Sequence, residues 1–262
     1  MWSGIKDWDK PSAENAVRCR SFEAASYEFN GIEMPYRYFE AKTGEKVPVV
    51  LFLHGADVTG RDNLQQLSMH DIGTIFADPA WQKKEPCHIL APQYDNGTHW
   101  AAGNTGRWLQ SLVGDHLRRH ENADRDRIYI YGYSAGAIGA FELLKKYPGF
   151  YAAAVLICGS TGTEGLEELK KIPLWLYHAD DDMIVNSGIH RGMWKEEYLG
   201  SAALYERLKA LGAEDIHLTS FEPGEMMRRY GLHAHCSWVP AGKDMEMWKW
   251  LFSHRRDRDE LA

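Results

Sequence analysis

The sequence has few cysteines and no long apolar run. Its four cysteines lie far apart and show neither the paired spacing of a metal site nor the density of a disulfide scaffold. They are Cys19, Cys87, Cys158 and Cys236, and we expect them to be reduced thiols. No apolar run approaches the roughly 18 residues that a membrane-spanning helix needs, so we expect no membrane as a partner.

The sequence also lacks an excess of positive charge. The formal net charge is −7, and lysine and arginine are dispersed rather than clustered. This leaves no basic patch for a nucleic-acid backbone or an anionic membrane surface. Residues 1–7 contain no basic region followed by an apolar stretch, so no secretory signal is visible. We expect a cytoplasmic protein; a secreted chain that had lost its leader would have the same features.

What the sequence does contain is a series of short apolar runs. Hydrophobic residues make up 44% of the 262 positions, enough for a large core in one domain. Two runs, residues 26–29 and 35–39, flank Asn30-Gly31, a dipeptide typical of a tight hairpin turn. Six further apolar runs, most of them nearly continuous, predict strands that are covered on both faces. They are residues 47–53, 88–91, 127–131, 153–158, 174–177 and 216–218.

Helical spacing lies between these runs, at residues 64–76, 108–120, 135–147, 203–211 and 245–254. Alternating strands and helices are typical of a mostly parallel sheet with crossover helices. The chain shows no repeat, low-complexity segment or long linker. We therefore predict a single doubly wound α/β domain over residues 1–262, with an N-terminal antiparallel hairpin and helices on both faces of the central sheet.

One pentapeptide joins a predicted strand to a predicted helix. Gly132-Tyr133-Ser134-Ala135-Gly136 has glycine two residues before and two residues after a serine. A sharp strand-to-helix turn that lifts a nucleophile clear of a sheet requires this arrangement. The turn also directs the unpaired N–H groups of the helix N-terminus at the reacting centre. A helix that merely begins with a capping serine would match the same pattern, but the flanking strand and helix favour Ser134 as a nucleophile.

A serine nucleophile needs a base to take its proton and an acid to orient that base. Acids follow the predicted strand 174–177, in the segment His178-Ala179-Asp180-Asp181-Asp182, at the end of a sheet where active sites assemble. Two histidines, His233 and His235, lie before the last predicted helix. From the pattern alone, each of the three aspartates and each of the two histidines is a candidate.

Several motifs together resemble one group of enzymes. They are Leu51-Phe52-Leu53-His54-Gly55, Gly60-Arg61-Asp62-Asn63, Asp126-Arg127-Ile128-Tyr129, the serine pentapeptide, Cys158-Gly159 and His235-Cys236-Ser237-Trp238. With these motifs, the chain from about Pro35 to its end resembles the esterase and predicted-peptidase branch of the α/β-hydrolase superfamily. That branch includes feruloyl esterases, polyhydroxybutyrate-depolymerase-like enzymes and dienelactone-hydrolase relatives. The resemblance implies the α/β-hydrolase fold and a Ser-His-Asp mechanism that uses no metal or organic cofactor.

The resemblance also implies which acid and base act with Ser134. The family acid lies four residues after a histidine, which corresponds to Asp182. The family base precedes a small residue, a serine and a tryptophan, which corresponds to His235. The acid loop departs from the family pattern at residues 179 and 186, where alanine and asparagine replace glycine and proline. A neighbouring aspartate therefore stays an alternative to Asp182.

The same fold implies an oxyanion hole made of two backbone N–H groups. One belongs to the residue after the nucleophile, Ala135, and the other to the loop after the early strand, where Ala56 is the expected donor. The remaining histidines of the two loops, His178 and His233, are expected to be structural or loop residues.

Two segments are longer than the family pattern. Residues 187–200 and 224–233 adjoin the acid and base loops and are predicted to be lid or pocket insertions. Large side chains in these segments, Trp194, Tyr198 and Met226, are candidate substrate-binding residues. Further candidates are Trp100 and Trp108, which follow a predicted strand, and Trp238, which follows the candidate base. The alternative is that such side chains only anchor the insertions to the body of the protein.

These observations favour a serine carboxylesterase for acyl or aryl esters. The resemblance implies feruloyl or acetyl esters of plant polysaccharide as one substrate class, so that the partner would be a small-molecule or oligosaccharide ester. Two other functions stay open. One is a serine peptidase, since the same serine, histidine and aspartate cleave amides. The other is a non-catalytic binding protein on the same scaffold, which is disfavoured because the sequence supplies a residue for each of the three catalytic positions.

Overall fold

The strand β3 (Val47–Leu53) is buried along its whole length, as expected of a strand with helices on both faces. The computed structural model describes residues 7–95, 100, 103–191 and 196–256. In it, β3 lies within an eight-stranded sheet in the order β1-β2-β4-β3-β5-β6-β8-β11. The other strands are β1 (Glu23–Phe29), β2 (Ile32–Phe39), β4 (His88–Pro92), β5 (Ala123–Tyr133), β6 (Ala153–Ile157), β8 (Leu174–Ala179) and β11 (Ile216–Phe221).

Strand direction in this sheet is mixed only at one edge. β2 is antiparallel to both β1 and β4, and all pairs from β4 to β11 are parallel. The predicted hairpin is confirmed: Phe29 pairs with Ile32, and Asn30 and Gly31 between them have φ values of 53° and 76°. Because parallel strands need crossover connections, the helices of the chain lie on the faces of the sheet.

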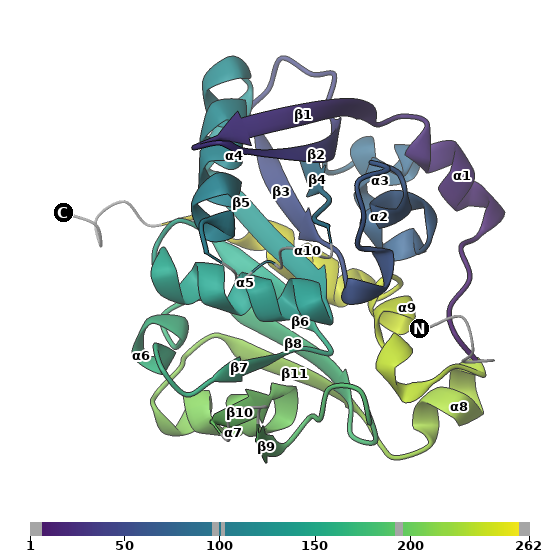
Figure 1. Ribbon diagram of the computed structural model, residues 1–262, viewed down its shortest axis with the longest axis vertical. Helices are drawn as coiled ribbons and strands as arrows, with labels where there is room; N and C mark the ends of the chain where they lie inside the picture. Colours follow the sequence, from purple (N-terminus) through teal and green to yellow (C-terminus); the bar gives the residue numbers. More distant parts are fainter. Residues whose placement is uncertain (1–6, 96–99, 101–102, 192–195, 257–262) are drawn as a thin grey trace.

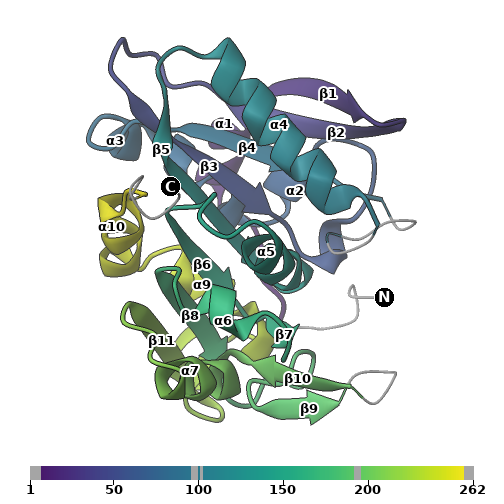
Figure 2. The ribbon, with the colours of Figure 1, turned by 90° about the vertical axis from the view of Figure 1, so that its left-hand side faces the viewer.

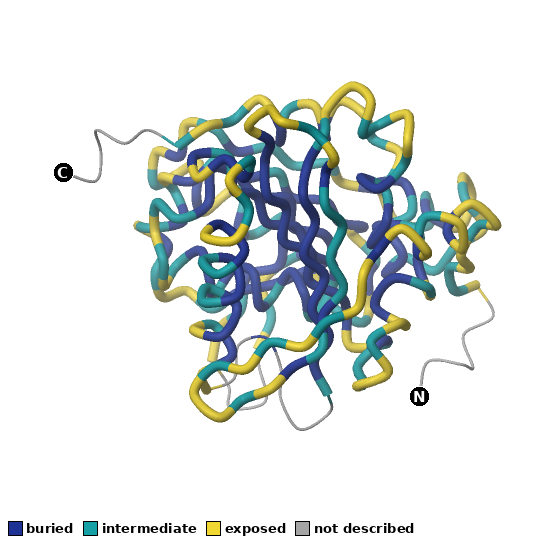
Figure 3. Tube along the Cα trace, turned by 90° about the horizontal axis from the view of Figure 1, so that it is seen from above, coloured by how far each residue is buried: buried dark blue, intermediate teal, exposed yellow. Residues whose placement is uncertain are grey.

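Helices cover the sheet on both faces, as predicted (Figures 1 and 2). One face packs against α4 (Thr105–Arg119), α5 (Ala135–Lys146), α6 (Leu166–Leu169) and α7 (Ser201–Ala210). The other packs against α1 (Ala13–Cys19), α2 (Gln65–Ser68), α3 (Pro79–Gln82), α8 (Glu225–Tyr230), α9 (Trp238–Ala241) and α10 (Met245–Ser253). Figure 2 places the central strands β5 and β6 between α5 and α10, and Figure 3 shows the buried residues gathered at the centre of the molecule. None of the helices in the described ranges has both the length and the apolar character to cross a membrane.

The continuous helix predicted over residues 64–76 is wrong. This segment forms α2 and two 3₁₀ turns, η2 (Asp71–Gly73) and η3 (Ile75–Ala77). The break falls at His70, whose backbone is extended with φ −142° and ψ 141°. A second constraint acts at Gly73, where a Cβ atom would lie 2.8 Å from the ring of Phe52. The apolar spacing is therefore met by short turns pressed against the sheet rather than by a helix.

The insertion predicted at residues 187–200 contains two short strands. β9 (Ile189–Arg191) and β10 (Glu197–Gly200) pair antiparallel with each other, and β10 also pairs with β7 (Ser160–Gly162). This small sheet lies beside α7 (Figures 1 and 2). The pairing with β7 joins the insertion to the body of the protein by backbone hydrogen bonds.

Candidate active site

Ser134 lies in a strained turn between β5 and α5. Its φ and ψ are 53° and −123°, a conformation that costs a non-glycine residue about 1–3 kcal/mol. The two flanking glycines permit this turn because nothing larger would fit. A Cβ at Gly132 would lie 2.7 Å from the backbone of Gly136, and one at Gly136 would lie 1.9 Å from the carbonyl oxygen of Leu53. The serine pentapeptide thus forms the sharp turn that its sequence predicts.

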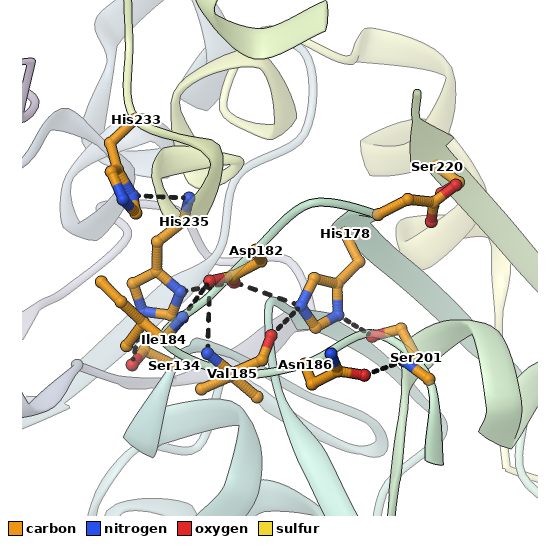
Figure 4. Close-up of polar contacts among 12 residues, drawn as sticks. Ser134, His178, Asp182, Ile184, Val185, Asn186, Ser201, Ser220, His233 and His235 are labelled. Carbon is orange, nitrogen blue, oxygen red and sulfur yellow. Dashed lines mark hydrogen bonds and ion pairs between the residues drawn. The ribbon is translucent and has the colours of Figure 1, made fainter. Parts of the chain in front are cut away.

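Three of the predicted site residues are joined by hydrogen bonds (Figure 4). Nε2 of His235 lies 2.9 Å from Oγ of Ser134, and Nδ1 of His235 lies 2.6 Å from Oδ2 of Asp182. Since a carboxylate only accepts, Nδ1 of His235 carries the proton and Nε2 of the neutral ring is free to accept one from the serine hydroxyl. Asp182 and His235 are buried, with 1% and 2% of their surface exposed.

Asp182 differs from its two neighbours in every contact. Its Oδ1 accepts from the amides of Ile184 and Val185, at 2.8 and 3.2 Å. Burial alone would raise the pKa of Asp182, but the hydrogen bonds from His178 and His235 outweigh it and hold the pKa well below its usual range. The carboxyl group is therefore an anion at neutral pH.

The other two aspartates point to different partners. Asp180 is exposed and accepts from the hydroxyl of Ser220 at 2.6 Å. Asp181 accepts from the amide of Gly224 at 2.7 Å and so fixes the start of α8. Of the three adjacent aspartates, only Asp182 is hydrogen-bonded to His235 in the described structure.

A second histidine, His178, is also hydrogen-bonded to Asp182. Nε2 of His178 lies 3.2 Å from Oδ2 of Asp182 and 2.9 Å from the carbonyl oxygen of Val185. Both partners are acceptors, so Nε2 is the donor. Its Nδ1 lies 2.8 Å from Oγ of Ser201, and both His178 and Ser201 are fully buried. His178 is thus a structural residue beneath the acid loop, as the sequence predicted.

The loop after β3 lies against the serine turn. A Cβ at Gly55 would lie 2.4 Å from the ring of Tyr133, the residue before Ser134. Ala56 opens the 3₁₀ turn η1 (Ala56–Val58), and Ala135 opens α5. The first N–H groups of a helical segment have no partner within it. These positions are suited to the oxyanion hole that the sequence predicts.

His54 fixes the same loop from the inside. Its ring is fully buried, and its Nδ1 lies 2.7 Å from the carbonyl oxygen of Gly55. Its Nε2 accepts from the amide of Tyr94 at 3.4 Å. Burial lowers the pKa of His54 to about 4, so the ring is neutral at physiological pH and acts as a neutral structural group.

Four of the six predicted substrate-binding residues are packed inside the protein. Each has about 1% of its surface exposed or less; they are Trp100, Trp108, Met226 and Trp238. The indole N–H groups of Trp100, Trp108 and Trp238 donate to His54 O, Tyr27 O and Asp9 Oδ2, and Met226 belongs to the core beneath α8. These side chains offer a ligand almost no exposed surface, which corrects the prediction. Sequence could not separate the two roles because core and pocket residues share the same apolar character.

The other two predicted residues lie in the insertion 187–200. Tyr198 is partly exposed on β10, stacks on His190 with ring centroids 5.9 Å apart and donates to Glu196 at 3.4 Å. Trp194 lies outside the described residues. The second insertion, residues 224–233, forms α8 and the start of the base loop.

Sequence reasoning missed the segment before α1. Trp8 packs against the rings of His233 and His235, each with centroids 6.0 Å apart, and against Trp238 at 5.3 Å. The carbonyl of Asp7 accepts from the amide of His233 at 2.8 Å. A tryptophan and two acids in this segment were the only available signal, and no motif links them to a loop more than 220 residues away.

The cysteines and the metal-ligating side chains add no further reactive centre. All four cysteines are buried and free, and burial raises the pKa of Cys236, beside the predicted base, to about 12. Among the residues that the structure describes, no group of three or more His, Cys, Asp and Glu side chains could hold a metal ion.

The strand order, the strained serine and its hydrogen-bonded histidine and aspartate define the α/β-hydrolase fold. Residues 36–171, just over half of the chain, match the family model described as Esterase PHB depolymerase. The chain belongs to this family. No protein among the curated sequences matches it.

Solved structures share this fold. One described as a thermostable esterase is 31% identical, with a TM-score of 0.80 over 92% of this chain and 64% of that chain. An acylaminoacyl peptidase from Pyrococcus horikoshii is 16% identical, with a TM-score of 0.61 over 92% of this chain and 43% of that one. Est1E from Butyrivibrio proteoclasticus is 12% identical, with a TM-score of 0.57 over 87% and 97%. The chain therefore spans less than two thirds of the length of the thermostable esterase and of the acylaminoacyl peptidase. The similarity to the peptidase and to Est1E, at 16% and 12% identity, establishes the fold alone.

Proposed function

We propose that the protein is a serine esterase in which Ser134, His235 and Asp182 form a catalytic triad. The observation that carries the proposal is the pair of hydrogen bonds that His235 makes, 2.9 Å to Oγ of Ser134 and 2.6 Å to Oδ2 of Asp182. A serine hydroxyl is a weak nucleophile unless a positioned base takes its proton. The match to the esterase family and the similarity to a thermostable esterase support an ester as the substrate.

The chemistry follows from the donor and acceptor roles of the ring. Oγ of Ser134 attacks the ester carbonyl carbon while its proton passes to Nε2 of His235, and Asp182 stabilises the imidazolium. The oxygen that gains negative charge accepts from the amides of Ala56 and Ala135, each worth roughly 3 kcal/mol of barrier. His235 then returns the proton to the leaving alcohol. A water attacks the acyl-enzyme by the same route, which releases the acid and restores the serine.

The substrate class that we propose is an acyl or aryl ester of a small alcohol or sugar, with feruloyl and acetyl esters as the first compounds to test. The match to an esterase family supports an ester as the substrate, and the resemblance of the sequence motifs to feruloyl esterases supports the choice of compounds. The two insertions border the acid and base loops, so they are the parts of the chain most suited to select the alcohol group.

The test is a panel of nitrophenyl esters of increasing chain length, together with methyl ferulate, nitrophenyl acetate and peptide anilides. We expect ester turnover that Ser134→Ala reduces by several orders of magnitude. Ser253→Ala, at an exposed serine at the end of α10, is the matched control and retains activity. Turnover of anilides but not esters would show a peptidase instead. A wild type that neither turns over substrate nor is labelled on Ser134 by a fluorophosphonate would refute the enzyme proposal.

A further inference from the structure

His70 lies between two carboxylates next to the candidate active site. Its Nδ1 lies 2.9 Å from Oδ2 of Asp9, and its Nε2 lies 2.6 Å from Oδ2 of Asp57. The three side chains are 3%, 11% and 9% exposed. The mechanism proposed above uses none of them.

The geometry fixes the charge of the ring. A carboxylate can only accept a hydrogen bond, so a histidine with an ionised carboxylate on each nitrogen must carry a proton on both. His70 is then an imidazolium. Burial alone would lower its pKa, but the hydrogen bonds to Asp57 and Asp9 outweigh this and raise the pKa to about 9. Burial alone would raise the pKa of Asp57, but the hydrogen bonds from His70 and Tyr133, with the charge of His70, hold that pKa below its usual value.

Each carboxylate continues into a different part of the site. Asp57 follows the oxyanion residue Ala56, and its Oδ1 accepts from the hydroxyl of Tyr133 at 3.0 Å, one residue before Ser134. Asp57 therefore connects His70 to the turn at Ser134 and to the loop of residues 54–57 after β3. Because this loop contains the proposed oxyanion donor Ala56, we call it the oxyanion loop.

The second carboxylate connects His70 to the base. Oδ2 of Asp9 accepts from Nε1 of Trp238 at 3.1 Å. The indole of Trp238 meets the ring of His235 edge-on, with centroids 5.5 Å apart, and Trp8 packs on the same ring at 6.0 Å. The ring of His70 itself lies 5.2 Å from Trp238 and 5.6 Å from Tyr133.

We propose that the imidazolium of His70 is a positioning residue, which holds the oxyanion loop and the base loop together through Asp57 and Asp9. The role rests on the proposed esterase function. Loss of the proton leaves two buried carboxylates facing a ring that can satisfy only one of them. One of the two loops then loses its charged anchor, so kcat falls while KM changes little, because both loops position groups that act on the transition state more than on the bound ester.

A pH dependence of activity follows from this role. The titratable groups that face His70 are Asp9 from the N-terminal segment, Asp57 from η1 and the hydroxyl of Tyr133 from β5. Asp71, the next residue, is directed to the amide of Ser12 and to Arg18. Because two anions stabilise the ring, the loops stay anchored at neutral pH and are released as pH rises through the pKa of His70.

The experiment compares Asp9→Asn with Asp71→Asn, a carboxylate that does not contact the ring. The rate of fluorophosphonate labelling of Ser134, and kcat and KM for a nitrophenyl ester, are measured from pH 6 to 10.5. In the wild type and in Asp71→Asn we expect both kcat and labelling to decline near pH 9. In Asp9→Asn we expect this decline to begin at least about one pH unit lower, since one of the two stabilising anions is gone. His70→Gln should lose the decline and lower kcat by roughly 10- to 100-fold, less than deletion of an oxyanion donor.

Selective ¹⁵N labelling of histidine gives a readout that does not depend on activity. With His70→Gln for assignment, both nitrogens of His70 should show imidazolium shifts at pH 7 and titrate near pH 9. A neutral ring at pH 7 would overturn the proposal. The same holds if kcat and the labelling rate decline at the same alkaline pH in Asp9→Asn and Asp71→Asn. If Ser134 is neither labelled nor needed for ester turnover, the proposed function fails, and the catalytic role of His70 fails with it even where the NMR titration shows the imidazolium.

Discussion

Nε2 of His178 donates to Oδ2 of Asp182, the same oxygen that accepts from His235. The acid therefore sits between two histidines (Figure 4), and its orientation depends on both. A hydrogen bond to a charged group contributes about 1.5–3 kcal/mol.

Replacing His178 should weaken catalysis without abolishing it. In His178→Asn we expect kcat to fall by about 10- to 100-fold with KM nearly unchanged, because Asp182 keeps the amides of Ile184 and Val185 but loses one donor. Ser201→Ala removes only the partner of Nδ1 and should have a smaller effect. Steady-state kinetics of both variants, with circular dichroism to verify folding, make the comparison; full kcat in the His178→Asn variant would show that the bond has no role in catalysis.

The three adjacent aspartates should respond very differently to substitution. We expect Asp182→Asn to lower kcat by about four orders of magnitude, because the amide no longer holds the correct tautomer of His235. Asp180→Asn should be close to wild type, since this side chain is exposed and bonded to Ser220. Asp181→Asn should change stability more than kcat through the start of α8. A loss of similar size at Asp180 or Asp181 would contradict the assignment of the acid.

The strain at Ser134 gives a prediction about stability. Ser134→Gly should unfold with a free energy about 1 kcal/mol higher than Ser134→Ala, because glycine tolerates a φ of 53° that alanine does not. Both variants lack the hydroxyl of Ser134, so its hydrogen bond to His235 is absent from both and cannot bias the comparison. Urea titration of the two proteins under the same conditions measures the difference; equal midpoints and slopes would show that the turn stores no strain.

Buried neutral histidines should make the protein sensitive to acid. Burial lowers the pKa of His54 to about 4, and burial together with His120 and His88 lowers that of His116 to about 2. The unfolded chain takes up a proton at each residue near pH 6.5 and the folded chain does not, so the free energy of unfolding falls as pH decreases below 6.5. Each such histidine contributes a slope of about 1.4 kcal/mol per pH unit between pH 6 and the pKa of the folded form.

His116→Leu isolates one of these contributions. We expect the slope of unfolding free energy against pH, measured from pH 6 to 4, to decrease by about 1.4 kcal/mol per unit. The control is His190→Leu, at a partly exposed position on β9, which should leave the slope near that of the wild type. An unchanged slope in the His116 variant would mean that this ring is already protonated in the folded protein.

The elements that could be predicted are those with a local signal. Each strand of the parallel part of the sheet contains an apolar run that the sequence shows, and most of these runs are nearly continuous. The turns at Asn30-Gly31 and at Ser134 are short motifs whose residues suit an unusual backbone conformation. The helix at 64–76 failed because apolar spacing does not reveal the extended backbone at His70. β7, β9 and β10 have three or four residues each, too few for a periodic pattern.

The site was predictable only where a motif or a chain order exists. Ser134 could be located from its pentapeptide, and chain order placed the candidate acid and base in two later loops. The choice of Asp182 and His235 within those loops came from the family resemblance. His70 and Asp9 are 61 positions apart and follow no such order. The buried tryptophans were misjudged because an aromatic residue beside a loop has the same composition whether it faces solvent or the core.

The bond between Trp238 and Asp9 joins residues 229 positions apart. Contacts of such long range form late in folding, because the entropy of closing the intervening loop must be paid before they contribute. A partly folded chain can therefore contain the whole sheet and the strained turn at Ser134 while the base loop is still unsupported. In a refolding experiment, recovery of activity should lag behind recovery of the far-ultraviolet circular dichroism signal. The delay measures how long the N-terminal segment with Asp9 takes to pack against Trp238.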